Sequence, residues 1–196
     1  MDDFLTLTPA FNYYYVAHNV WGDVISQVKE DENHHLQYVA AGTSVYSTAG
    51  KAGSWLGNAK KKITRLMIVA HGSPGTFFLG QDITSENIAP LGGWLYSFFE
   101  QNAAGIQILG CNSAADSTQV IGQYEYGQAH PLNEVSLSHR GYELLRALAG
   151  AARQKVEGAL HGQSKVGLTL RMTCRRVYPN GAQQLFVAGG VKEPGL

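Results

Sequence analysis

Apolar and polar positions along the chain follow a pattern that predicts parallel strands connected by helices. Two short, almost uninterrupted apolar runs, at residues 63–70 and 106–109, have the composition of strands covered on both faces of a sheet. Between them, apolar residues recur at helical spacing, at Ile88, Leu91, Leu95, Phe98 and Phe99. The order strand, helix, strand is that of a right-handed crossover between neighbouring parallel strands. The sequence therefore predicts an α/β fold with a mainly parallel sheet flanked by helices.

Further elements are predicted before and within this unit. An aromatic, β-branched run predicts a strand at 11–17, and a short apolar run predicts another at 36–40. A weaker helix, softened by glycines, is predicted over 45–62, and 77–79 suits one arm of a hairpin. A valine at every fourth position predicts one more short helix, with Val20, Val24 and Val28 on its face.

The last third of the chain predicts a helix followed by two strands. Ser138 is a plausible N-cap for the helix. The apolar face of this helix would contain Leu144, Leu145, Leu148 and Val156. Strands are predicted at 166–173 and 184–188, on either side of a turn at 179–181. The tail from 187 to 196 is expected to be a loose end.

Composition narrows the class of protein. A chain of 196 residues with 44% hydrophobic and 15% charged residues suits one domain, spanning 1–196. Fifteen basic and fifteen acidic residues cancel, which argues against a nucleic-acid partner. No apolar run is long enough to span a membrane, and the acidic N-terminus does not resemble a secretory signal. We therefore expect a cytoplasmic protein, or one exported without a cleaved signal peptide, that keeps its two cysteines as thiols.

Two residues with the potential for catalysis stand where the two central strands end. His71 follows the first apolar run and Cys111 the second. Ligands of parallel α/β sheets gather at the carboxyl ends of the strands, so the side chains are expected to meet there, within roughly 6–7 Å. A histidine can generate the thiolate and protonate a leaving amine. The backbone amides of Gly72 and Cys111 would then form an oxyanion hole.

Simpler readings exist for both residues and for the other candidates. A cysteine at the end of an apolar strand can be a small buried hydrophobe, and His-Gly can be a turn. Cys174 lies in a strand pattern and is expected to be structural, without a disulfide to Cys111. His34 and His35 would point to opposite faces of a strand, and no histidine has metal-ligand spacing, so no metal or other cofactor is expected. Ser73 lacks the elbow motif of a serine hydrolase.

The two strand ends resemble the catalytic blocks of the caspase-like cysteine peptidases, which include caspases, clostripain, gingipains and several bacterial relatives. The resemblance spans residues 11–163. Its specific parts are Val69-Ala70-His71-Gly72 and Leu109-Gly110-Cys111, and the longer stretches 71–75, 79–80 and 108–114 look closest to poorly characterised bacterial members. The resemblance implies a three-layer sandwich, with His71 as general base and Cys111 as nucleophile. It also implies the amides of Gly72 and Cys111 at the oxyanion, and a protein or peptide substrate.

Two features depart from the family pattern. The polar stretch 112–138 is longer than expected before the next helix, and no residue can be assigned to a specificity pocket. We expect this stretch to be a mobile loop that gates the site or is itself cut, with Asp116 the nearest acidic candidate for cleavage. The alternative to a peptidase is a catalytically silent member of the same fold that acts as a binding or interaction module.

Overall fold

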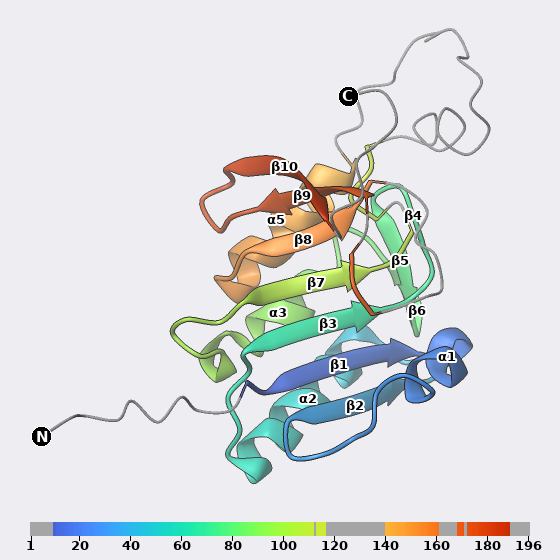
Figure 1. Ribbon diagram of the computed structural model, residues 1–196, viewed down its shortest axis with the longest axis vertical. Helices are drawn as coiled ribbons and strands as arrows, with labels where there is room; N and C mark the ends of the chain where they lie inside the picture. Colours follow the sequence, from blue (N-terminus) through green and yellow to red (C-terminus); the bar gives the residue numbers. More distant parts are fainter. Residues whose placement is uncertain (1–9, 112, 117–139, 161–167, 171, 189–196) are drawn as a thin grey trace, which may run out of the picture.

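The computed structural model describes residues 10–111, 113–116, 140–160, 168–170 and 172–188. Seven strands form one sheet in the order β10-β9-β8-β7-β3-β1-β2 (Figure 1). Their bounds are Asn12–Ala17 (β1), His34–Val39 (β2), Arg65–Val69 (β3), Gly105–Leu109 (β7), Val156–Ala159 (β8), Met172–Val177 (β9) and Gln183–Ala188 (β10). The five strands from β2 to β8 are parallel to one another, whereas β9 runs antiparallel to both of its neighbours.

Helices flank both faces of this sheet. Their bounds are Trp21–Ile25 (α1), Val45–Ala59 (α2), Ala89–Gly93 (α3) and Arg140–Ala152 (α5), with short 3-10 turns at His18–Val20 and Tyr96–Phe98. Three of the helices, α2, α3 and α5, cover one face of the sheet (Figure 1). On the opposite face, Val24 of α1 packs with Tyr14 and Val16 of β1. The predicted mixed α/β fold with a mainly parallel sheet in a three-layer sandwich is therefore confirmed.

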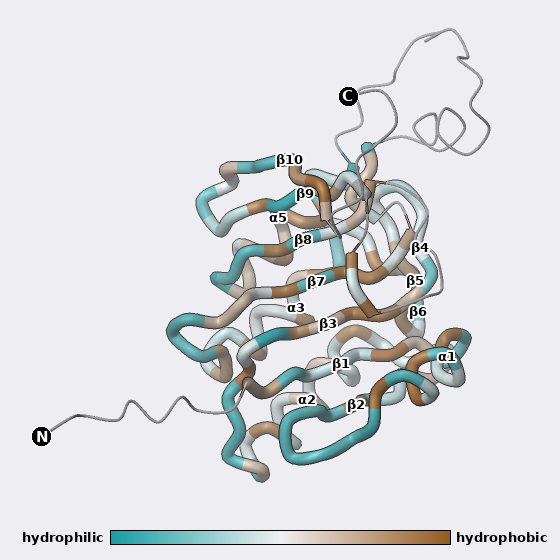
Figure 2. The backbone as a smooth tube through the Cα atoms, viewed as in Figure 1, coloured by the Kyte–Doolittle hydropathy of each residue, from teal (hydrophilic) through white to brown (hydrophobic). Residues whose placement is uncertain are grey.

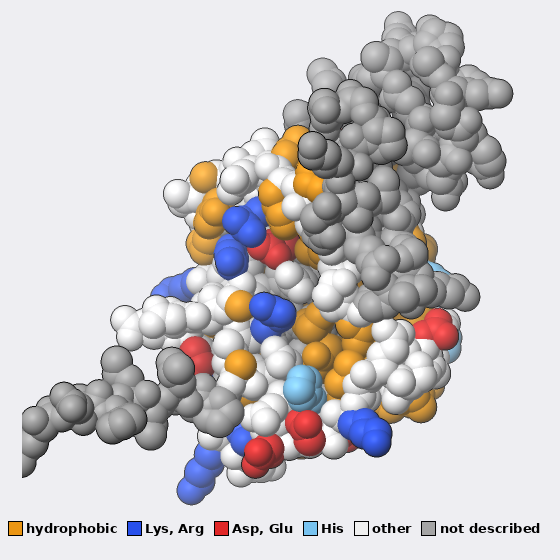
Figure 3. All heavy atoms as spheres, viewed as in Figure 1, with side chains coloured by type: hydrophobic (Ala, Val, Ile, Leu, Met, Phe, Trp, Pro, Cys, Tyr) orange, Lys and Arg blue, Asp and Glu red, His pale blue; other side chains and the backbone are white. Residues whose placement is uncertain are grey.

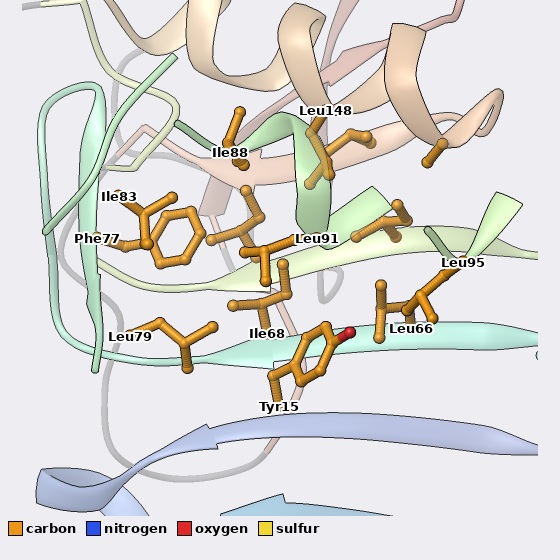
Figure 4. Packing of buried hydrophobic residues seen from close by; sticks show 14 of the residues in the cluster. Tyr15, Leu66, Ile68, Phe77, Leu79, Ile83, Ile88, Leu91, Leu95 and Leu148 are labelled. Carbon is orange, nitrogen blue, oxygen red and sulfur yellow. The ribbon is translucent and has the colours of Figure 1, made fainter. Parts of the chain in front are cut away.

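The larger core lies between the sheet and α2, α3 and α5. Leu66 and Ile68 of β3 point toward Leu91 of α3, Leu148 of α5 and Leu95, which follows α3 (Figure 4). In Figure 2, β3 starts with a hydrophilic segment at the exposed Arg65 and continues as a hydrophobic one. The nearly continuous apolar run at the end of β3 is explained by this cover, because Met67 and Val69 are buried on the other face.

A small three-stranded sheet stands beside the carboxyl end of β3. It is formed by β4 (Gly72–Ser73), β5 (Thr76–Leu79) and β6 (Gln81–Ile83), all antiparallel. Phe77, Leu79 and Ile83 point from it into the larger core (Figure 4). The predicted hairpin arm at 77–79 is therefore confirmed, and it fixes the chain directly after His71.

Two predicted helices are shorter in the structure than in the sequence analysis. The helix expected from 88 to 99 divides into α3 and a 3-10 turn, and the one expected around Val24 is reduced to α1. Close packing against α5 accompanies the first break. A Cβ atom on Gly92 would lie 2.7 Å from the Cβ of Ala152 and 2.8 Å from the Cδ1 of Leu148. Glycine at this position lets α5 pack directly against α3, and the helix does not continue past the glycine pair.

Two predictions in the last third of the chain were wrong. Val156 opens β8 and is not part of the preceding helix, which ends at Ala152 and is followed by Arg153 with a positive φ of 53°. The strand expected at 166–173 starts instead at Met172 and runs to Val177, although residues 166 and 167 lie outside the described part. Arg175 and Arg176 concealed this strand, because each is paired with a carboxylate that the sequence does not place beside it.

Candidate active site

His71 and Cys111 stand at the same edge of the sheet, on neighbouring strands. β3 and β7 pair in parallel, with Val69 opposite Leu109 in the register. When this register is continued by two residues, His71 comes opposite Cys111. The spacing between neighbouring strands, about 5 Å, is the separation expected of the two backbones. The two strand ends therefore lie side by side, and the expected approach of the two side chains stays a prediction.

A close backbone contact holds the two strand ends together. A Cβ atom built on Gly72 would lie 2.6 Å from the carbonyl oxygen of Cys111 and 3.3 Å from its nitrogen. One built on Gly110 would lie 3.2 Å from the carbonyl oxygen of Ala70. Any side chain at residue 72 would therefore push the two tips apart. The glycine after the histidine has a steric role that the sequence analysis did not assign to it.

The amide of Gly72 is oriented by the hairpin that follows it. Pro74 and Gly75 form the turn between β4 and β5, and the positive φ of Gly75 (68°) suits the third position of a type II turn. The amide of Phe78 donates to the carbonyl oxygen of His71 (2.9 Å). That bond makes Gly72 and Phe77 a non-hydrogen-bonded pair. The N–H of Gly72 therefore points away from β5, as an oxyanion-hole donor would have to.

The two candidate side chains differ in exposure. His71 is exposed, and Cys111 is half-buried. Neither Cys111 nor Cys174 is in a disulfide. Cys174 is buried in β9 in a small apolar cluster with Ala159 and Leu170. Of the two thiols, only Cys111 is therefore within reach of a substrate at the edge of the sheet.

The chain directly after Cys111 is anchored in ways that the sequence analysis missed. Asp116 makes a bidentate ion pair with Arg175 of β9, with N–O distances of 2.7 and 2.8 Å. Its Oδ1 also accepts a hydrogen bond from the amide of Tyr142 in the first turn of α5 (3.1 Å).

The amide of Ala114 donates to the carbonyl of Ala159 (3.0 Å). These contacts, together with the bond from Ser113 Oγ to the carbonyl of Gly110 (3.2 Å), fix the segment that leaves the cysteine.

These anchors argue against Asp116 as a cleavage site. Its carboxylate is held by Arg175 and by the start of α5, so the peptide bond after it could be presented to an active site only if both contacts broke. Asp116 therefore supports the site and is a poor candidate for processing. The rest of the predicted loop, residue 112 and residues 117–138, lies outside the described residues, so its gating role stays a prediction.

The adjacent histidines of β2 do not form a shared site. His34 and His35 point to opposite faces of β2, as predicted. His34 contacts Asn12 and Asp31, whereas His35 stacks on Trp55 of α2. Within the described ranges, no group of three or more His, Cys, Asp or Glu residues is placed to hold a metal ion. No helix in the same ranges is long and apolar enough to cross a membrane.

Comparisons with models of protein families, with curated proteins and with solved structures find no match to this chain.

Proposed function

We propose that this protein is a cysteine endopeptidase that hydrolyses peptide bonds with a His71–Cys111 dyad. One observation carries the proposal: the two residues leave adjacent parallel strands at one edge of the sheet, and Gly72 lies in backbone contact with Cys111. The exposure of His71 and the half-buried position of Cys111 are compatible with a substrate that approaches from solvent. No cofactor is required for this chemistry, because the dyad supplies both nucleophile and proton carrier.

The proposed reaction has two stages. In the first, His71 takes the proton of the Cys111 thiol, and the thiolate attacks the carbonyl carbon of the peptide bond. The amides of Gly72 and Cys111 stabilise the oxyanion, and the C–N bond breaks as His71 gives its proton to the leaving amine. In the second, His71 takes a proton from water, and the resulting hydroxide attacks the thioester. The acid leaves and the thiol is restored.

A digest of a mixed peptide library tests the proposal. Wild-type protein is compared with Cys111→Ala and with Cys174→Ala, which removes the buried thiol from the other cluster. We expect the same cleavage products from the wild type and Cys174→Ala, and none from Cys111→Ala. Products that persist in Cys111→Ala would show that the nucleophile is wrong.

Alkylation by iodoacetamide separates the peptidase from the catalytically silent alternative. A thiol activated by His71 reacts much faster than an ordinary exposed thiol near neutral pH, and His71→Ala should remove the difference. If the library is not cut, and Cys111 reacts at the same rate with and without His71, the chain is a silent member of the fold and the peptidase proposal is overturned.

A further inference from the structure

We propose that the site accepts an apolar side chain on the acyl side of the bond that is cut, and that Leu109 is the main surface it contacts. This proposal rests on the proposed peptidase function and adds the class of substrate. The acyl-side residue is the one whose carbonyl carbon Cys111 attacks. Its side chain must therefore lie close to Cys111, on whichever surface surrounds the end of β7.

The pleat of the strands decides which surface that is. Gln107 and Leu109 lie on the same side of β7, because side chains alternate along a strand, and Cys111 follows Leu109 by two residues. This is the side opposite α2, α3 and α5, since Ile106 and Ile108 fill the core under those helices. Val69, the register partner of Leu109 on β3, lies beside it in the same row. Cys111 therefore follows directly on the end of β7 where this pair of apolar side chains lies.

The apolar row beside Cys111 continues on both sides of these two residues. We define it as Val69, Leu109 and Ala159, which occupy equivalent positions on β3, β7 and β8. Leu168 packs against the same group of side chains as Val69 and Leu109. Figure 3 shows hydrophobic side chains gathered on this face of the sheet, near the ends of the parallel strands.

Part of this row remains accessible. Ile106 and Ile108 are completely buried, whereas Leu109 on the same strand is only half-buried. A leucine or phenylalanine side chain that covered Leu109 would bury apolar area on both partners, which favours binding by about 25 cal/mol for each Å² removed from water. Leu109 packs against the clusters that involve Leu168 and Leu170, and Val69 and Ala159 are buried, so among the described residues Leu109 is the member of the row that stays partly accessible.

Charges near the apolar row do not favour an ionic acyl-side residue. Glu157 lies two residues before Ala159 on β8, roughly 7 Å from the row. It binds Arg176 (2.7 Å) and accepts a hydrogen bond from Gln107 (2.9 Å). This network satisfies its own charges. Asp116, the acid closest in sequence after Cys111, is held by Arg175. These two ion pairs therefore offer no spare counter-ion to a lysine or aspartate side chain on Leu109, which would lose hydration there.

Three active-site probes test the proposal. They are peptidyl acyloxymethyl ketones that differ only in the acyl-side residue, which is leucine, aspartate or lysine. The Cys111 thiolate displaces the carboxylate of the probe and leaves a stable thioether, which mass spectrometry locates. We expect the leucine probe to label Cys111 at least tenfold faster than either of the others. Faster labelling by the aspartate or lysine probe, or equal rates for all three, overturns the apolar preference and leaves the peptidase function standing. No labelling of Cys111 by any probe overturns both.

Substitutions at Leu109 assign the preference to this residue. Leu109→Asp should slow the leucine probe at least tenfold and speed the lysine probe, whereas Leu185→Asp makes the same change on the exposed edge strand β10 and should alter neither rate. Leu109→Phe keeps the surface apolar and is the variant to use if Leu109→Asp does not fold. A fourth probe with alanine at the acyl-side position is added for this variant, and the preference should shift from leucine toward alanine because the larger ring fills the space. An unchanged preference in Leu109→Phe would show that Leu109 does not contact the substrate.

Discussion

The two faces of the sheet consist of alternating residues of the same strands, but their side chains differ in how far they are buried. On the face under α2, α3 and α5, β3 and β7 present Leu66, Ile68, Ile106 and Ile108, all completely buried. On the other face, the same two strands present the buried Met67 and Val69, the exposed Arg65, and the half-buried Gln107 and Leu109, with the candidate catalytic residues just beyond the strand ends. The helix-covered face is a closed core, and the other face leaves polar groups and part of an apolar row accessible.

This difference assigns stability and chemistry to separate parts of the molecule. Substitutions on the helix-covered face remove packing from a filled core, where the loss of even one methylene group lowers the stability of the fold. Changes at the strand ends on the other face alter groups that already face solvent. The two sets of residues should therefore respond differently to substitution, and activity and stability should separate cleanly between them.

The largest effect is expected for turnover at the strand ends. Cys111→Ala and His71→Ala should each lower turnover by at least about 10³-fold, because nucleophile and base act as a unit. For the same reason, the double variant should lose little more than either single one. The measurement is the rate of cleavage of a library-derived peptide, together with the free energy of unfolding in urea.

The free energy of unfolding is the control for this prediction. It should stay within about 0.5 kcal/mol of wild type in His71→Ala, whose side chain is exposed. Additive losses in the double variant would show that the two residues act independently, and the dyad would have to be abandoned.

The second effect contrasts two neighbours on β7. Ile108→Ala should lower the free energy of unfolding by about 2–5 kcal/mol, because it opens a cavity in the closed core. Leu109→Ala, on the other face, should cost no more than about 1.5 kcal/mol, since part of the side chain is already exposed to water. Equal losses in urea denaturation would mean that the two faces are equally closed.

The third effect concerns the ion pair between Glu157 and Arg176, on the face of the sheet opposite α2, α3 and α5. Glu157 and Arg176 have side chains that are 8% and 25% exposed. Glu157→Ala should cost about 1–3 kcal/mol, less than a fully buried pair, because water can partly replace the carboxylate at Arg176. Combining it with Arg176→Met should recover part of the loss. A double-mutant cycle in urea measures the coupling, and a value near zero would show that the pair is no more than a surface contact.

The sequence predicted the elements that have a local pattern of apolar residues. It was misleading for the elements whose position depends on partners far away in the sequence. The apolar runs ending at Val69 and Leu109 identified β3, β7 and their shared edge, because strands buried on both faces are apolar throughout. Arg175 and Arg176 hid β9, since the carboxylates that neutralise them come from residues 59 and 19 positions away. For the same reason, the sequence did not reveal that Asp116, in the loop after Cys111, is held by Arg175. The steric role of Gly72 depends on a contact with Cys111 that only the assembled sheet creates.

The smallest effect compares adjacent histidines on the two faces of β2. His35 lies under α2, with its ring stacked on Trp55 at a centroid distance of 3.7 Å, beside Tyr13 and paired with Glu30. Burial lowers the pKa of His35 below its ordinary value of 6.5, and Glu30 opposes the shift. The folded protein therefore binds fewer protons than the unfolded chain just below pH 6.5. The free energy of unfolding should fall as the pH drops through this window, and level off below the folded-state pKa.

The variant His35→Phe should flatten this dependence between pH 7.5 and 5, because phenylalanine keeps a ring against Trp55 and cannot take up a proton. His34→Phe is the matched control: it removes a histidine from the other face of the same strand and leaves the contribution of His35 in place. Urea midpoints are measured above pH 5, so that carboxylates, whose ordinary pKa values are near 4, contribute little to the slope. If the pH dependence of the free energy of unfolding persists in His35→Phe and disappears in His34→Phe, it does not come from His35, and the prediction is wrong.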